Sequence, residues 1–157
     1  MSRICNIISP DFMTILYRRI YNFYEYAANT VRQVAMEGLK ARQCVLVVDD
    51  HPQVLRFVEI GLRVRGFDVI TTTSGRQALE MMEEVKPDVM LLDIVMPEIS
   101  GFEVLEELRA FSKVPVIVLS GSIENRDEAL RLGASAFVPK PFEPDEIVRE
   151  ISSLLSR

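Results

Sequence analysis

The chain has 157 residues, 48% hydrophobic and 26% charged, with a formal net charge of −5. These values indicate a globular domain with an appendage and argue against general nucleic-acid binding, for which basic surfaces are typical. The sequence has no run of 18 apolar residues and starts with a poor signal peptide, so we expect no membrane span and a cytoplasmic location.

Charge divides the sequence into two parts. Residues 1–43 carry six Lys or Arg and three Asp or Glu, net +3, whereas residues 44–157 carry twelve and twenty, net −8. The change of sign falls just before an apolar run. We therefore interpret residues 1–43 as an amino-terminal extension and residues 44–157 as an acidic domain.

The extension has apolar residues at near-helical spacing from Phe12 to Val31, with tyrosines among them. This pattern predicts a long amphipathic helix for docking or dimerisation, or for a membrane surface in view of Arg18 and Arg19. An alternative of equal weight is that this segment is not native coding sequence and that the protein begins at Met36.

From Cys44 onward, short apolar runs alternate with segments of helical spacing. The predicted strands are 44–48, 68–71, 88–92, 114–119 and 135–139, and the predicted helices are 52–66, 74–85, 101–111, 123–133 and 143–155. Runs that are apolar throughout indicate strands buried on both faces. The sequence therefore predicts an α/β fold, a doubly wound five-stranded parallel sheet.

Some residues carry local signals. Ser74 with Gln77 forms a capping-box pattern at the start of the second helix, and Gly133 suits the C-terminal cap of the fourth. Cys44 leads into an apolar run and is expected to be a buried thiol. The only other cysteine is Cys5, so we expect no disulfide and a reducing compartment.

Polar residues follow four of the five predicted strands. Asp49 and Asp50 follow the first strand, Asp93 the third, Ser120 the fourth and Lys140 the fifth. Reactive groups gather at the carboxyl ends of strands in such folds, so we expect these side chains to converge on one rim.

Three carboxylates in one crevice suit Mg²⁺, which prefers oxygen ligands. A cation beside Asp93 favours phosphoryl transfer to that carboxylate, while Ser120 and Lys140 are suited to contact phosphoryl oxygens. Each residue also has a simpler explanation: Asp50 before Pro52 suits a helix cap, and Ser120 suits a turn. Convergence after four different strands favours the site.

Four segments occur in order within residues 44–157: VLVVDDHP, DVMLLDIVMPEISGFEVLEELR, VPVIVLSGS and GASAFVPKPF. They resemble the receiver domain of bacterial response regulators in two-component signalling, including stand-alone receivers of the chemotaxis type. The resemblance implies a flavodoxin-like strand order 2-1-3-4-5. It also implies that Asp93 accepts a phosphoryl group from a phosphohistidine on a sensor histidine kinase or a histidine phosphotransfer protein.

The resemblance also implies roles around Asp93. Mg²⁺ would be held by Asp50, Asp93 and the backbone carbonyl of Val95, with Asp49 helping through water. Lys140 would contact the phosphoryl group, and the peptide that follows Lys140 would be cis.

Ser120 and Phe137 match the family's switch pair, which moves together on phosphorylation. The implied function is a phosphorylation-controlled signalling module that changes its affinity for a downstream protein and turns over no external substrate. Apolar Val95 offers no group to position an attacking water, so we expect slow self-dephosphorylation.

An alternative function is a Mg²⁺-dependent phosphohydrolase that forms an aspartyl phosphate, similar to enzymes of the haloacid-dehalogenase type. Those enzymes have a D-x-D pattern at one strand end, and the second Asp of the pattern acts as acid and base. Here Val95 stands two residues after Asp93 and cannot transfer a proton, which argues against this alternative. A degenerate receiver that binds partners without phosphate is a third alternative, which the intact acidic residues disfavour.

Three further expectations concern the rim and the chain end. His51, the only histidine, is expected to be an exposed helix residue, with a phosphodonor or metal-ligand role as the alternative. From Ser120 to Lys140 is twenty residues, about two fewer than in similar receivers, so the partner cannot be inferred by resemblance. The last predicted helix reaches the chain end, so we expect a stand-alone receiver without a DNA-binding output domain.

Overall fold

The computed structural model describes residues 42–156, together with Asn22 and Glu25. The predicted amphipathic helix of the extension lies outside these described residues. None of the described helices is long and apolar enough to cross a bilayer.

Five parallel strands form one sheet in the order β2-β1-β3-β4-β5, which confirms the predicted fold and strand order. The strands are β1 (Cys44–Val48), β2 (Asp68–Thr72), β3 (Val89–Asp93), β4 (Val116–Ser120) and β5 (Ala136–Pro139). The helices are α2 (Pro52–Val64), α3 (Gly75–Val85), α4 (Gly101–Arg109), α5 (Asn125–Arg131) and α6 (Pro144–Leu155). Helices and strands alternate along the chain as predicted.

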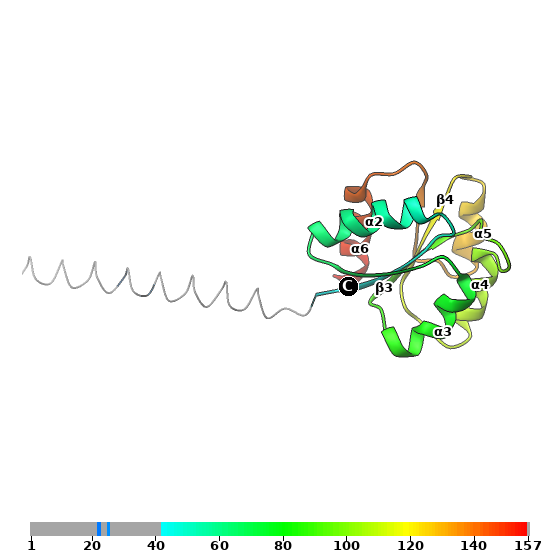
Figure 1. The fold of residues 1–157 in the computed structure, drawn as a ribbon, viewed down its shortest axis with the longest axis horizontal. Helices are drawn as coiled ribbons and strands as arrows, with labels where there is room; N and C mark the ends of the chain where they lie inside the picture. The colour runs from blue at the N-terminus through cyan, green and yellow to red at the C-terminus, as the bar shows by residue number, and fades with distance from the viewer. Residues whose placement is uncertain (1–21, 23–24, 26–41, 157) are drawn as a thin grey trace, which may run out of the picture. The chain divides into compact units, whose positions relative to one another are not determined.

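The sheet is buried on both faces. Helices α2 and α6 cover one face, and α3, α4 and α5 cover the other (Figure 1). Residues of β1 alternate between the two cores: Val45 and Val47 pack toward α2 and α6, while Leu46 and Val48 pack toward α3 and α4. This two-sided burial explains why the strand sequences are apolar at consecutive positions.

The start of α2 does not match the explanation that Asp50 caps this helix. Its N-cap residue is His51, with Pro52 in the first turn, and no side chain caps the helix. The carboxylate of Asp49 instead accepts a hydrogen bond of 2.9 Å from the backbone N–H of His51. Helix capping by Asp50 is therefore wrong, and the position of this carboxylate needs another explanation.

Two other local predictions were confirmed only in part. The Ser74 hydroxyl accepts a hydrogen bond from the backbone N–H of Gln77, but the Gln77 side chain is bonded to the Thr72 hydroxyl, so half of the capping box forms. Cys44 is half-buried, not fully buried, because it is the first residue of β1. Gly133 follows α5 with a φ of +100°, as expected for a residue after a helix end.

A capping box that was not predicted starts α4. The Ser100 hydroxyl accepts a hydrogen bond from the backbone N–H of Glu103, whose carboxylate accepts one from the backbone N–H of Ser100. The Ser-x-x-Glu pattern was visible in the sequence. This box fixes the start of α4 in the segment that follows Asp93.

Candidate functional site

The carboxyl ends of β1, β3 and β5 bring their polar residues together, as predicted. The Nζ atom of Lys140 lies 2.6 Å from Oδ2 of Asp49 and 3.0 Å from Oδ1 of Asp93. Asp49 is fully buried and Asp93 is 3% exposed. Two carboxylates are therefore held out of water with one ammonium between them.

The adjacent carboxylates of Asp49 and Asp50 have different surroundings. Both oxygens of Asp49 are engaged, one by the backbone N–H of His51 and the other by Lys140. Oδ1 of Asp50 is buried and has no hydrogen-bond partner among the residues that the structure describes. Nδ1 of His51 lies 2.8 Å from this oxygen without meeting the geometry of a hydrogen bond. Asp50 therefore retains an open acceptor oxygen.

This set of ligand atoms suits a divalent cation. Single side-chain atoms of Asp49, Asp50, His51 and Asp93 all lie within 4.8 Å of one another. A buried carboxylate oxygen without a partner is costly, and a hard cation that prefers oxygen ligands would remove that cost. The residues present therefore fit Mg²⁺, and the unpaired oxygen of Asp50 is the observation that supports the fit.

His51 is exposed at the rim, as expected, with 63% of its side chain accessible. Its Nδ1 nevertheless faces the two acidic residues that precede it, at 2.8 Å from Asp50 and 3.4 Å from Asp49. The imidazole therefore borders the acidic pocket, a position that the sequence pattern alone left open.

Burial and the ion pairs set the protonation behaviour of the pocket. Burial raises the pKa of the Asp93 carboxyl, and the hydrogen bond and charge of Lys140 only partly oppose this rise. Burial by itself lowers the pKa of Lys140, but bonding to Asp49 and Asp93 outweighs it, so the net change is upward. Lys140 therefore remains a cation, while the protonated form of Asp93 is favoured more than in water.

Ser120 is fully buried at the end of β4, but its hydroxyl is turned into the loop that follows. Its Oγ accepts hydrogen bonds from the side-chain amide of Asn125 at 2.9 Å and from the backbone N–H of Ser122 at 3.2 Å. Its own proton is directed to the carbonyl of Ser122, at 3.3 Å. Among the described residues, none of these bonds goes to Asp93 or Lys140.

The remaining predicted residues lie around this centre. Phe137 is half-buried, stands opposite Val118 in the register of β4 and β5, and packs against the core under α3, α4 and α5. Ser120 is two residues beyond Val118 and therefore lies on the same sheet face. Val95 is 69% exposed. The Lys140–Pro141 peptide is cis, as expected.

A sequence profile of the response regulator receiver domain matches residues 45–152. The chain belongs to the response regulator receiver family. The receiver is 44% identical to the transcriptional regulatory protein KdpE of Mycobacterium tuberculosis over 115 residues, which are 72% of this chain and 51% of KdpE. It is 41% identical to the DNA-binding response regulator MtrA of Mycolicibacterium smegmatis over 118 residues, 74% of this chain and 52% of MtrA. The chain spans about half the length of these curated relatives.

Solved receivers have the same fold. The chemotaxis protein CheY4 of Vibrio cholerae is 30% identical, with a TM-score of 0.67, and the match covers 72% of this chain and 98% of CheY4. The receiver domain of the Francisella response regulator 1452 is 32% identical, with a TM-score of 0.70, over 74% of this chain and 98% of that domain. The predicted family is thus confirmed by sequence and by structure.

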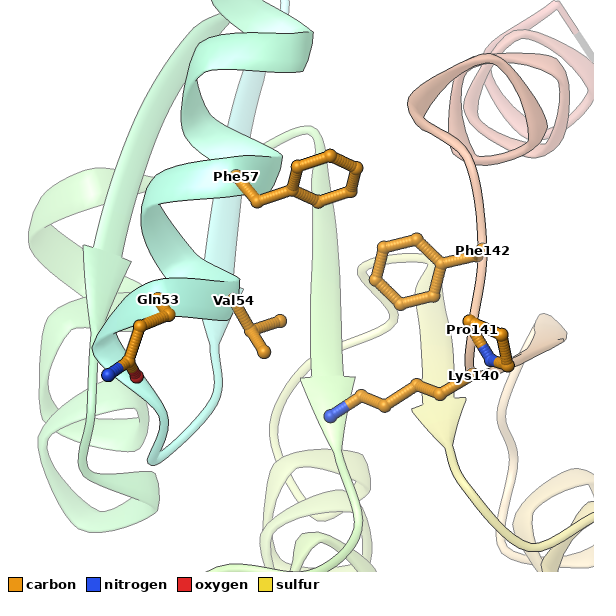
Figure 2. Close-up of a pocket in the computed structure, with 6 residues that line it drawn as sticks. All are labelled: Gln53, Val54, Phe57, Lys140, Pro141 and Phe142. Carbon is orange, nitrogen blue, oxygen red and sulfur yellow. The ribbon is translucent and has the colours of Figure 1, made fainter.

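An apolar pocket of about 600 Å³ adjoins the acidic pocket of the receiver at Lys140. Figure 2 shows Phe57 of α2 facing Phe142, which lies between β5 and α6, with Lys140 below them. The two ring centroids are 6.4 Å apart, and the planes are tilted by 38°. The apolar pocket is lined by Gln53, Val54, Phe57, Lys140, Pro141 and Phe142. The sequence pattern does not reveal this pocket, because its two sides are far apart along the chain.

Proposed function

We propose that this receiver accepts a phosphoryl group on Asp93 from a phosphohistidine of a sensor histidine kinase or a histidine phosphotransfer protein. Phosphorylation then changes its affinity for a downstream protein. The observation that carries this proposal is the Lys140 ammonium, which lies 3.0 Å from a buried carboxylate oxygen of Asp93 at the strand-end rim. A carboxylate nucleophile with an adjacent fixed cation is suited to phosphoryl transfer.

In the proposed reaction, an oxygen of the Asp93 carboxylate attacks phosphorus, and the bond between phosphorus and the histidine nitrogen breaks. The imidazole leaves with the electron pair of that bond and takes up a proton from solvent. Lys140 pairs with an oxygen of the transferred group and compensates its charge. None of these steps requires the receiver to donate a proton. They are therefore compatible with an apolar residue, Val95, two positions after Asp93.

Asp50 and Asp93, with the backbone carbonyl of Val95, are the groups proposed to hold Mg²⁺, and Asp49 contributes through water. When bound, Mg²⁺ neutralises charge on the phosphoryl oxygens and orients the group. The proposal assigns Asp50 the more direct role because one of its buried oxygens is unpaired, whereas both oxygens of Asp49 are engaged.

The apolar pocket supports the proposed kind of donor. A phosphohistidine is part of a protein, so its carrier has to dock close to Asp93 to deliver the group. The pocket between Phe57 and Phe142 ends at Lys140 and offers an apolar surface next to the acidic centre (Figure 2). Phe57 is 47% exposed, which leaves this surface accessible to a partner.

The proposed response to phosphorylation passes through Ser120 and Phe137. The hydroxyl of Ser120 moves to a phosphoryl oxygen on Asp93, and Phe137, on the same sheet face, moves into the space that opens. Phe137 has no phenolic oxygen, so packing alone determines its two positions. The change is a shift between two populations and requires only a few kcal/mol of difference in binding free energy.

The test of the phosphoacceptor is intact-mass measurement after incubation with acetyl phosphate, with and without Mg²⁺. We expect one added phosphoryl group in the wild type with Mg²⁺, none in Asp93→Asn, and normal labelling in the control Asp127→Asn, an exposed site on α5. Persistent label on Asp93→Asn, or full labelling with chelator present, contradicts the proposal. Release of many phosphates per protein molecule from a phosphate monoester, which does not phosphorylate receivers, would support the phosphohydrolase alternative.

A further inference from the structure

The hydroxyl of Ser120 uses its whole hydrogen-bonding capacity inside the loop between β4 and α5. A serine hydroxyl has one proton to donate and two lone pairs that accept. The proton is directed to the carbonyl of Ser122, and the lone pairs accept from the backbone N–H of Ser122 and the side-chain amide of Asn125. The contact with Asn125, at 2.9 Å, is the shortest of the three. A new partner therefore requires that an existing bond be given up.

Asn125 joins this hydroxyl to the beginning of α5. It is the first residue of the helix and is half-buried, and the N-cap residue Glu124 makes no side-chain capping bond. Helix α5 has only 7 residues. The Asn125 amide thus provides a direct side-chain link between the end of β4 and the first turn of a short helix.

The close spacing of β4 and α5 makes this link possible. Only four residues, 121–124, separate Ser120 from Asn125. Because the helix begins so soon after the strand, its first side chain reaches the hydroxyl of Ser120.

We infer that Asn125 is a positioning residue, which holds the Ser120 hydroxyl in the loop before phosphorylation and transmits its movement to α5 afterwards. This inference rests on the proposed function, in which Ser120 moves to a phosphoryl oxygen on Asp93. In that movement the Ser120 hydroxyl stops donating to the carbonyl of Ser122 and donates to a phosphoryl oxygen instead, and the hydrogen bond from Asn125 is stretched or broken. Asn125 therefore stabilises the arrangement before phosphorylation. When that arrangement is lost, the change reaches the first turn of α5 through Asn125.

The test is a titration of the full chain with beryllofluoride, a phosphoryl mimic, in the presence of Mg²⁺, followed by NMR. The chemical shifts of backbone amides next to Asp93 report binding of beryllofluoride. The shifts of the α5 backbone amides and of the Phe137 ring report the switch. In Asn125→Ala and in Asn125→Leu, which keeps the approximate side-chain shape, half-conversion should need about two- to tenfold less beryllofluoride, the equivalent of one neutral hydrogen bond. The shifts in the first turn of α5 should also be smaller.

Controls separate positioning from a general loss of structure. Ser122→Ala keeps the backbone N–H and carbonyl that contact Ser120, so it should behave as the wild type. Asn125→Gln keeps an amide donor and should lie closer to the wild type than Asn125→Ala. In a Ser120→Ala background, Asn125→Ala should have no further effect, because its partner hydroxyl is gone.

The outcomes distinguish this inference from the proposed function. If the wild type shows no shifts near Asp93 with beryllofluoride, the proposed phosphoacceptor site is wrong. If the wild type responds normally and the Asn125 variants need the same concentration and show the same shifts in α5, the site stands and the inference is overturned. An additive effect of Asn125→Ala in the Ser120→Ala background would overturn it as well.

Discussion

The ammonium of Lys140 lies 2.6 Å from Oδ2 of Asp49, and these residues are 91 positions apart in the chain. Asp49 is fully buried and the Lys140 side chain is 23% exposed, so the ion pair connects the ends of β1 and β5 in a place with little water. Such a pair adds little stability relative to apolar residues, but the loss of one partner leaves an uncompensated buried charge. The pair therefore makes the rim sensitive to single substitutions.

The first prediction concerns Lys140→Ala. With chelator present at neutral pH, we expect the free energy of unfolding to fall by about 3 kcal/mol, because two buried carboxylates lose their shared cation. Urea unfolding measures this, with exposed Lys113→Ala as a control expected to stay within about 0.5 kcal/mol of the wild type. Added Mg²⁺ should restore more stability to Lys140→Ala than it adds to the wild type. Equal losses in both variants would show that the ion pair is energetically unimportant.

The second prediction separates the adjacent carboxylates. We expect Asp50→Ala to raise the Kd for Mg²⁺ by at least about tenfold, or 1.4 kcal/mol, because its unpaired buried oxygen is the open ligand atom. Asp49→Ala should raise the Kd less, since that residue is assigned a contact through water. Amide chemical shifts during a Mg²⁺ titration measure both values. The opposite ranking would mean that Asp49 is the direct ligand.

The third prediction is a pH dependence at Asp93. Burial raises the pKa of Asp93 in the folded protein, so folding favours the protonated carboxyl. The resulting contribution to stability is present at low pH and is lost as the pH rises through the raised pKa. Asn at this position carries no charge at any pH. We therefore expect Asp93→Asn to raise the Tm by a few degrees at about pH 7, and this gain to vanish near about pH 3.9, the ordinary value for a carboxyl. A Tm of Asp93→Asn below that of the wild type at pH 7 would contradict this prediction.

The fourth prediction concerns Gly101, the first residue of α4. Its backbone N–H donates to the carbonyl of Ile94 at 2.9 Å, and a Cβ on Gly101 would lie 2.0 Å from the carbonyl oxygen of Asp93. Because that obstacle is backbone, we expect Gly101→Ala to destabilise the domain by about 3 kcal/mol and to displace Asp93. Thermal unfolding and labelling by acetyl phosphate measure the two effects. Gly121→Ala is the control, since a Cβ at Gly121 meets nothing within 4 Å.

Several site positions were predictable because they depend on strand ends. An apolar run such as 44–48 marks a buried parallel strand, and the residue after it has to lie at the carboxyl edge of the sheet. That rule was enough to bring Asp49, Asp93 and Lys140 together before any contact was known. The resemblance to receivers added the strand order, which the order of segments along the chain does not specify.

Other features depended on atoms that the sequence pattern does not place. Asp49 and Asp50 are adjacent and chemically identical, yet one has both oxygens engaged and the other keeps one unpaired. The difference arises from the turn into α2, where the backbone N–H of the N-cap residue His51 donates to Asp49. The helix-cap explanation for Asp50 failed for the same reason.

By itself, the sequence determined the alternation of strands and helices, the family, and the residue types at the rim, because apolar periodicity and strand-end position act locally along the chain. Only the tertiary structure decided that Asn125 bonds to Ser120, that Lys140 bridges two carboxylates, and that Phe57 faces Phe142 across a pocket. These contacts depend on helix starts, loop lengths and side-chain rotamers that are fixed only when the separate elements pack together.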